Sequence, residues 1–441
     1  MSNKLLTVLA LGPSKVFKWV FKNDEDYSCA ERSDFQIVYE VNICLGTSSF
    51  LNKIGHEWIT YLRNFAKMNC ILIPIIFLFI SNLLDAQDNV NTFIVDTYVN
   101  SSTSHGIFVY DFNSKTGEFT FRSKVAGEDK PSYVTTSHDG RFVYSVNEVK
   151  NGTISAYALN SESGELTFLN RASTGGESPC YAAIDKKGKI LFAGNYGSGS
   201  IAAFSMKADG SIGNNIQFIQ NKGSSIDKRR QAGPHVHGTV LSPDQKFILS
   251  PDLGTDKVNI FKFDPDNFSQ PLSPADPAFV SVSSGSGPRH IIFHPSSKYA
   301  YLTHEMGGII IVFDYKGGKL SEKQSISMLT PGFKGKIGGA DVKISKDGRF
   351  LYASNRGDAN ELIIYSINRK DGKLKLVGHQ SSLGKTPRNL AIDPTDNFIL
   401  VTNQESDEIT IFKRDQQTGL LAPTGNNIKI SKPVCIQFIK H

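Results

Sequence analysis

The sequence predicts an all-β protein: a seven-bladed β-propeller with four antiparallel strands per blade and a last blade closed by both termini. The first observation is composition, because 39% hydrophobic residues and 38 glycines in 441 residues favour a large core made of many short strands and turns. The second observation is an internal repeat. The third is that strands left over at the two ends of the chain complete each other.

A phrase of 17 residues occurs six times after residue 90, with no gap inside any copy. Each copy contains an apolar strand, a turn that often reads Asp-Gly, and a second apolar strand with a polar end. The copies recur about every 50 residues, the period of large propeller-blade repeats. The intervening stretches, such as residues 152–170, supply two further strands, so each repeat is one blade. The copies begin at Ser132, Cys180, His237, Arg289, Ala340 and Arg388.

The strands that remain at the two ends of the chain predict a shared seventh blade. Residues 434–441 read as its innermost strand, and residues 92–98, 106–112 and 119–125 read as its other three strands. Closing the ring in this way removes exposed sheet edges that would invite aggregation.

An apolar run at residues 70–84 has the features of a secretory signal and is short for a membrane span. We therefore expect a mis-assigned or disordered extension at 1–67, a signal peptide at 68–86 and the propeller domain at 87–441, with Met68 as the true start. The product is then exported, periplasmic or extracellular, without stable membrane insertion after signal cleavage. It is cytoplasmic if the signal is not used. The alternative is a membrane anchor behind a small cytoplasmic segment.

The net charge restricts the possible binding partners, and the positions of the cysteines indicate whether they form a disulfide. The formal net charge is +6, and Lys and Arg are scattered among Asp and Glu, so we do not expect nucleic acid as a partner. Cys180 and Cys435 are the cysteines beyond the expected signal. They fall in blades that are not neighbours, which predicts free thiols.

Equivalent positions of all blades face the same part of a propeller's central channel, so each column of the repeat forms a ring. The start of one strand lies beside the end of its antiparallel neighbour, and both rings therefore surround one mouth. The first column contains Ser132, Cys180, His237, Arg289, Ala340, Arg388 and Val434. The last column contains Tyr98, Glu148, Tyr196, Leu253, Glu305, Arg356 and Gln404.

Blades three to six concentrate charge at this mouth. Like charges packed in a partly dehydrated site cost stability, and an anionic ligand would relieve that cost. The alternative is that these residues form inter-blade ion pairs, and for Glu148, which is separate from the cluster, both interpretations stay open. The cluster contains His237, Arg289, Glu305, Arg356, Arg388 and Gln404.

Three further histidines adjoin the cluster. Side-chain alternation along a strand should turn His290 and His304 away from the mouth. His235 and His237 resemble a metal pair, but no third ligand is suitably placed and the arginines oppose a cation. We expect no metal.

Several phrases resemble one known family: GPHVHGTVLSPDQKF from Gly233, GSGPRHIIFHPSSKYAYLTHE from Gly285 and ADVKISKDGRFLYASNRG from Ala340. They are similar to the lactonase family of seven-bladed propellers, which contains bacterial propeller-type 6-phosphogluconolactonases and fungal carboxymuconate-lactonizing cyclases. The resemblance covers about residues 91–441. It departs at His304, where the family often has Asn, and at Asp96, where the family has Gly in a Gly-Thr-Tyr opening.

The resemblance implies a site at His237, Arg289, Glu305 and Arg356, and lactone hydrolysis without a cofactor. Glu305 or His237 is expected to activate water, Arg289 to stabilise the carbonyl oxygen, and Arg356 with Arg388 to clamp a phosphate or carboxylate. Further substrate contacts are expected at Gln404, His235 and Glu148.

The expected partner is a small anionic lactone, and the expected state is a monomer. The sequence leaves open which lactone is used. Two alternatives to hydrolysis also stay open. The first is a carboxymuconate cycloisomerase-type enzyme, and the second is a non-catalytic propeller that binds proteins or glycans.

Overall fold

The computed structural model describes residues 6–12, 15–21, 29–32, 89–100 and 105–439. The chain divides into two compact units, Met1–Phe79 and Ile80–His441. The expected start at Met68 and signal peptide at 68–86 lie outside the described residues. Among the described residues, no helix is long and apolar enough to cross a membrane. The first unit contains a three-stranded antiparallel sheet of β1 (Leu6–Gly12), β2 (Lys15–Phe21) and β3 (Cys29–Arg32).

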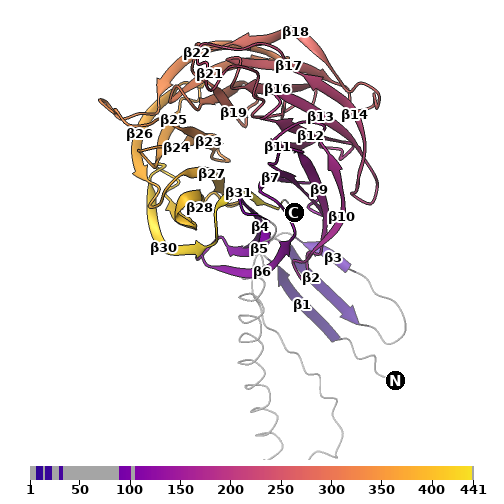
Figure 1. Cartoon of the computed structure of the whole chain (residues 1–441). Helices are drawn as coiled ribbons and strands as arrows, with labels where there is room; N and C mark the ends of the chain where they lie inside the picture. The colour runs from indigo at the N-terminus through magenta and orange to yellow at the C-terminus, as the bar shows by residue number, and fades with distance from the viewer. Residues whose placement is uncertain (1–5, 13–14, 22–28, 33–88, 101–104, 440–441) are drawn as a thin grey trace, which may run out of the picture. The chain divides into compact units, whose positions relative to one another are not determined.

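In its described part, the second unit consists of seven four-stranded antiparallel sheets arranged around a common hub (Figure 1). Blade 1 contains β7 (Pro131–Thr136), β8 (Phe142–Asn147), β9 (Thr153–Leu159) and β10 (Leu166–Ser173). Blade 2 contains β11 (Pro179–Ile184), β12 (Ile190–Asn195), β13 (Ser200–Met206) and β14 (Ile212–Gln220). Blade 3 contains β15 (Val240–Leu241), β16 (Phe247–Asp252), β17 (Lys257–Phe263) and β18 (Leu272–Ser281).

The next three blades repeat this order, with the first strand of each at the hub and the fourth at the periphery (Figure 1). Blade 4 contains β19 (Pro288–Phe293), β20 (Tyr299–His304), β21 (Ile309–Lys316) and β22 (Lys319–Ser327). Blade 5 contains β23 (Gly339–Ile344), β24 (Phe350–Asn355), β25 (Glu361–Ile367) and β26 (Leu374–Ser381). Blade 6 contains β27 (Pro387–Ile392), β28 (Phe398–Asn403), the 3-10 turn η2 (Gln404–Ser406), β29 (Glu408–Arg414) and β30 (Leu421–Lys429).

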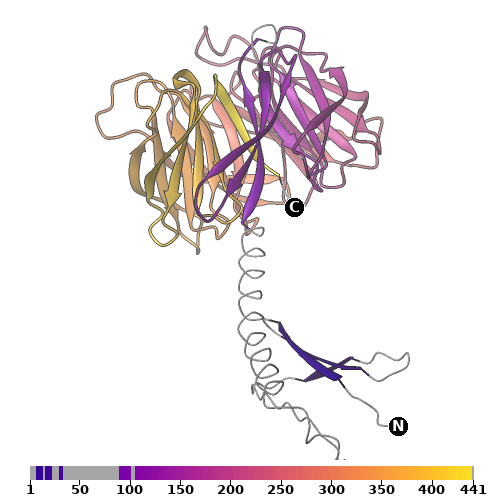
Figure 2. The ribbon, with the colours of Figure 1, turned by 90° about the horizontal axis from the view of Figure 1, so that it is seen from below.

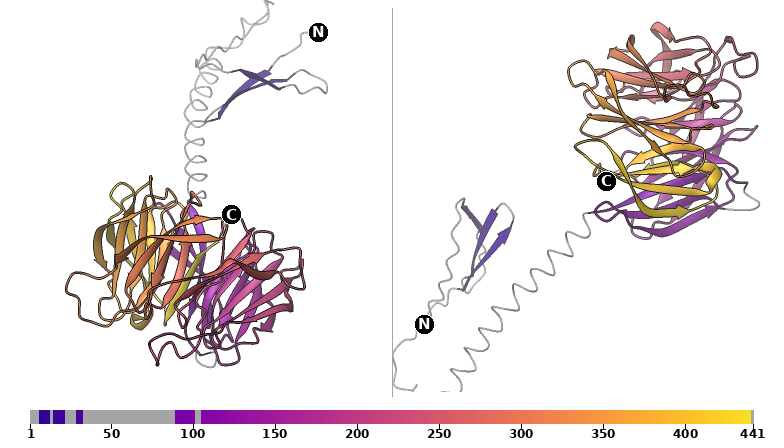
Figure 3. Two further views of the ribbon diagram at one scale, coloured as in Figure 1. Left: turned by 90° about the horizontal axis from the view of Figure 1, so that it is seen from above. Right: turned by 90° about the vertical axis from the view of Figure 1, so that its left-hand side faces the viewer.

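Blade 7 combines both ends of the propeller, as the sequence predicted. The C-terminal β31 (Pro433–Phe438) pairs with β4 (Val90–Thr97), which is followed by β5 (His105–Asn113) and β6 (Phe119–Ala126). The yellow β31 lies beside the purple N-terminal strands of the propeller in Figure 3. The predicted seven-bladed propeller is therefore confirmed, including its shared blade.

Apolar side chains fill the spaces between adjacent blades. The strands of each blade run between the two faces of the ring (Figure 2). Between blades 6 and 7, Phe112 packs edge-on against Phe398 with ring centroids 5.3 Å apart, and Phe93 is fully buried beside them. Each such buried side chain contributes about 1.5–3 kcal/mol. This packing gives the hub strands a fixed frame.

The predicted Asp-Gly turns follow from local hydrogen bonding. The carboxylate of Asp139 accepts a hydrogen bond from the Ser137 hydroxyl at 2.6 Å, and Gly140 then takes a φ of +70°, which favours glycine. Asp347 and Gly348 repeat the arrangement in blade 5. These turns set the register of the two strands nearest the hub.

The innermost strands share one irregularity. In six blades the pairing of the first two strands shifts just after the first residue of the hub strand. Such bulges re-aim side chains that would otherwise follow strand alternation. The positions left out of the pairing are Ser132, Cys180, Arg289 with His290, Ala340 with Asp341, Arg388 and Val434.

Blade 3 differs, because its hub strand is shorter than the repeat suggests. The sequence placed the strand start at His237, but β15 covers Val240–Leu241 alone. The amide of His237 donates to the carbonyl of Pro251 on β16 at 2.9 Å, and Pro251 has no N–H to donate back. His237 therefore sits in an irregular segment at the hub.

Candidate active site

A cavity of about 130 Å³ opens at one end of the hub. All of its lining residues come from the two columns of the repeat, so the two rings do meet at one mouth. Cys180, His237 and Arg388 belong to the first column, and the others follow the second strands of their blades. The lining consists of Glu148, Cys180, Tyr196, His237, Glu305, Arg356 and Arg388.

Glu305 is the electrostatic centre of the cavity. Its Oε1 accepts from Nη2 of Arg230 at 2.6 Å, and its Oε2 lies 2.7 Å from Nη2 of Arg356 and 3.2 Å from Nε of Arg289. Burial alone would raise the pKa of Glu305, but the charges of Arg356 and Arg289 outweigh it and hold the pKa well below its usual range. Glu305 is therefore ionised and weakly basic.

His237 is a buried neutral imidazole. Burial and the charge of Arg289 hold the pKa of His237 well below its usual value. Its Nε2 lies 3.9 Å from Oε2 of Glu305, and its Nδ1 lies 3.6 Å from Sγ of Cys180. Burial raises the pKa of the Cys180 thiol, so Cys180 is a neutral neighbour of the ring rather than a thiolate. His237 is therefore unprotonated at neutral pH, with an Nε2 lone pair that can take up a proton transiently.

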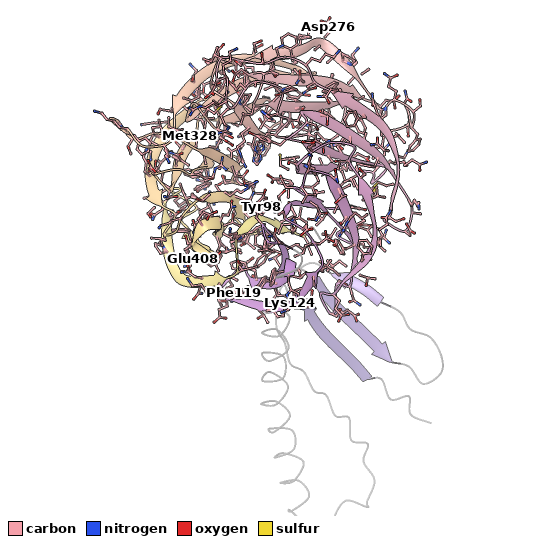
Figure 4. All side chains as sticks on the ribbon, in the orientation of Figure 1. Tyr98, Phe119, Lys124, Asp276, Met328 and Glu408 are labelled. Atoms are coloured by element: carbon pink, nitrogen blue, oxygen red, sulfur yellow. The ribbon has the colours of Figure 1, made fainter. Side chains whose placement is uncertain are left out.

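The opposite wall of the cavity holds a second ion pair. Nη2 of Arg388 donates to Oε2 of Glu148 at 3.0 Å, and the Arg388 guanidinium lies over the ring of Tyr98 at 5.5 Å. The Tyr98 hydroxyl donates to Glu148 at 3.4 Å, and Figure 4 labels Tyr98 near the centre of the ring. Glu148, which the sequence left open, thus lines the cavity as the partner of Arg388.

Arg230 is a site residue that the sequence analysis missed. It lies in the segment between β14 and β15, and besides Glu305 it contacts the Tyr196 hydroxyl at 3.2 Å. That segment is not part of the repeated phrase, so no column contains it. The available signal was the interval between Cys180 and His237, which is the longest between repeat copies.

Charge at the site does not balance. Both ion-pair partners are glutamates, so the alternative of inter-blade ion pairs describes part of the arrangement. Nevertheless, among the described residues of the site, four arginines face two glutamates, and the neutral His237 adds no charge. The surplus is positive, and an anion is the complementary ligand. The residues concerned are Arg230, Arg289, Arg356, Arg388, Glu148 and Glu305.

Two expected substrate contacts lie outside the lining. His235 stacks on the ring of Tyr196 at 4.5 Å and donates from Nδ1 to the Tyr196 carbonyl at 2.8 Å, so it positions that tyrosine. Gln404 is buried at the start of η2. Across the described residues, no three side chains of His, Cys, Asp or Glu gather closely enough to hold a metal ion.

His290 does not line the cavity, in keeping with the expectation that it turns away from the mouth. The bulge at Arg289 and His290 breaks the alternation, and the His290 ring lies edge-on to that of His237 with centroids 5.3 Å apart. Its Nδ1 donates to Asp341 at 2.8 Å. His304 is fully buried and does not line the cavity.

Comparisons with known proteins agree with this architecture. The family model described as "Lactonase, 7-bladed beta-propeller" matches residues 92–438. This chain belongs to the lactonase family. A 6-phosphogluconolactonase of Formosa agariphila is 35% identical over 79% of this chain and 99% of its own length, and that of Bacillus subtilis is 30% identical over 78% and 97%. The solved periplasmic gluconolactonase of Pseudomonas aeruginosa is 35% identical, covers 79% of this chain and 99% of its own, and has a TM-score of 0.76.

Most of the site residues that the family resemblance implies also line the observed cavity. His237, Glu305 and Arg356 line the cavity, while Arg289 is buried against Glu305 outside the lining. Arg289 therefore acts on the cavity from behind its lining, through its contact with Glu305 and through its charge near His237. Cys180 is a free thiol, as is Cys435, which confirms the prediction for both.

Proposed function

We propose that this chain hydrolyses a small lactone, either the anionic 6-phosphogluconolactone or its neutral counterpart gluconolactone, in the cavity around His237 and Glu305. The observation that carries the proposal is a neutral imidazole beside an ionised carboxylate, under surplus positive charge. The named relatives, which include a 6-phosphogluconolactonase and a periplasmic gluconolactonase, support this class of substrate.

His237 is the proposed base. In the tautomer that carries its proton on Nδ1, next to the Cys180 sulfur, the Nε2 lone pair takes a proton from water as the water oxygen bonds to the lactone carbonyl carbon. The ring C–O bond then breaks, and the ring oxygen receives the proton from His237. Glu305, 3.9 Å from Nε2, stabilises the transient imidazolium. Its own three arginine contacts make Glu305 the weaker candidate for the base.

Two arginines face the substrate. Arg356 lines the cavity beside Glu305 and is the proposed stabiliser of the developing oxyanion. Arg388 lines the opposite wall and anchors a polar group of the substrate. Arg289 keeps Glu305 ionised and in place. These steps require no cofactor.

The test is hydrolysis of 6-phosphogluconolactone and of unphosphorylated gluconolactone, measured as acid release and corrected for spontaneous ring opening. We expect acceleration of at least one of them. Carboxymuconate is assayed in parallel by its loss of absorbance. Cyclisation of carboxymuconate without lactone hydrolysis would identify a cycloisomerase, and turnover of none of these compounds would favour a binding propeller.

We also propose that the mature chain is an exported monomer of residues 87–441. The signal-like run at 70–84 supports export, and the Pseudomonas aeruginosa relative is a periplasmic protein. N-terminal sequencing of the protein from its host should begin at Gln87, and light scattering should give the mass of one chain. Residues 1–67 on the exported product would contradict the proposed start.

A further inference from the structure

Arg230 differs from the other three arginines of the site in exposure. Its side chain is 44% exposed, compared with 3% for Arg289 and 17% for Arg356. Arg388 is also largely buried, in its pair with Glu148. Arg230 is therefore the guanidinium that a group entering from solvent meets first.

The backbone that carries Arg230 is held in place. Gln231 is fully buried and donates to the Leu253 carbonyl and to Asp256, both at 2.8 Å. The Asp227 carboxylate accepts from the amides of Arg229 and Arg230 at 2.9 and 3.1 Å. A change of partner at Arg230 thus requires side-chain rotation alone, while the segment keeps its conformation.

We propose that Arg230 recognises the anionic substituent of the lactone, and that a phosphate or carboxylate borne away from the reacting ring takes the guanidinium over from Glu305. This inference rests on the proposed function and names Arg230 as its specificity-determining residue. Arg230 does not line the cavity of about 130 Å³, but it contacts the lining residue Glu305 and is 44% exposed, so a substituent that extends from a ring inside the cavity can meet it. The planar guanidinium fork suits bidentate binding of an oxyanion.

The transfer of Arg230 from Glu305 to the substrate should affect catalysis by Glu305 and His237 as well as substrate binding. While Arg230 contacts Oε1, Glu305 shares its negative charge among three guanidinium groups. After Arg230 turns to the substrate, Glu305 keeps Arg289 and Arg356 and interacts more strongly with the imidazolium of His237. An anionic substituent should therefore raise kcat in addition to lowering KM, whereas a neutral lactone leaves Arg230 on Glu305.

The kinetic test compares 6-phosphogluconolactone with gluconolactone in the parent, in Arg230→Ala and in Arg230→Lys. Arg229→Ala is the matched control, because it removes the same charge from the adjacent exposed position of the same segment. We expect Arg230→Ala to reduce kcat/KM for the phosphorylated lactone on the order of 10–100-fold, since a hydrogen bond to a charged group is worth about 1.5–3 kcal/mol. The rate with the neutral lactone should rise instead, because Glu305 then keeps only Arg289 and Arg356 and interacts more strongly with the imidazolium of His237. The kcat/KM of Arg230→Lys for the phosphorylated lactone should lie between those of the parent and Arg230→Ala, and the kcat/KM of Arg229→Ala should match that of the parent.

A binding measurement separates this inference from the proposed function. Calorimetric titration with 6-phosphogluconate and with gluconate needs no turnover. The parent and Arg229→Ala should bind the phosphorylated acid more tightly, and Arg230→Ala should lose that preference. A preference that survives in Arg230→Ala, or that Arg229→Ala loses equally, would overturn the role of Arg230 whether or not the parent hydrolyses lactones. Absence of hydrolysis with an Arg230-dependent phosphate preference would overturn the proposed function alone.

Discussion

The hub contains two polar cavities whose charges are arranged differently. The cavity around Glu305 has surplus positive charge and a half-exposed arginine. A second cavity of about 290 Å³ is lined by Tyr133, Tyr181, His290, Asp341 and Lys343, among others. There, the Asp341 carboxylate accepts hydrogen bonds from Lys343 at 2.7 Å, from His290 at 2.8 Å and from Asn389 at 2.6 Å.

The charges of the second cavity balance each other. Burial alone would raise the pKa of Asp341, but the charge of Lys343 and the hydrogen bond from His290 outweigh it and lower the pKa far below its usual value. One cation balances one carboxylate, and the hydrogen bonds to Asp341 link hub strands of blades 4, 5 and 6. The same bulged strands thus build a charge-balanced structural network in one cavity and an unbalanced site in the other. Charge balance, rather than volume, distinguishes the candidate active site from the second cavity.

The largest expected effect is that of Glu305→Gln. It leaves three guanidinium groups without their shared carboxylate, so we expect a loss of about 3–5 kcal/mol in unfolding free energy. Activity should also fall, on the order of 10²-fold or more in kcat, because the imidazolium of His237 loses its counter-ion. Urea unfolding and lactone hydrolysis measure the two effects. A variant as stable and as active as the parent would show that Glu305 does not organise the site.

Asp341→Asn is the matched change in the second cavity, where the charges balance. It removes a buried carboxylate from Lys343, and we expect a loss of about 1–3 kcal/mol in unfolding free energy. The kcat for lactone hydrolysis should stay within a few-fold of the parent value, about what an indirect contact contributes. A loss of activity as large as that of Glu305→Gln, without loss of stability, would place Asp341 in the catalytic machinery instead.

A smaller effect concerns pH. Burial and the charge of Arg289 lower the pKa of His290 to about 3 in the folded state, whereas an unfolded histidine has a pKa of about 6.5. Between these values the unfolded chain binds more protons, so unfolding free energy falls as pH falls below about 6.5, by up to about 1.4 kcal/mol per pH unit. His290→Asn should reduce this slope in urea unfolding between pH 6.5 and 5. Equal slopes would contradict a buried neutral His290.

The sequence predicted the blades and the ring columns because both depend on periodicity. Strand alternation, Asp-Gly turns and a fixed repeat are local signals, and the cavity lining follows from equivalent positions such as Glu148 and Arg356. The shared blade followed from counting strands at the two ends.

Other features were not accessible to the same reasoning. The bulge at His290 depends on pairing geometry, which a two-residue period does not contain. Arg230 lies in an irregular segment between β14 and β15, and its contact with Glu305 joins residues 75 positions apart. The choice between Glu305 and His237 as base depended on how many arginines surround the carboxylate, which required distances.

We propose that the cavity with surplus positive charge hydrolyses lactones with His237 as the base. The most direct measurement compares kcat of the parent, His237→Asn and His290→Asn on the better of the two gluconolactones, with unfolding midpoints recorded for each protein. We predict that His237→Asn folds and loses on the order of 10²–10⁴-fold in kcat, while His290→Asn loses stability and keeps most of its kcat. Full activity in a folded His237→Asn, or the opposite ranking of the two variants, would contradict the role of His237 as the base.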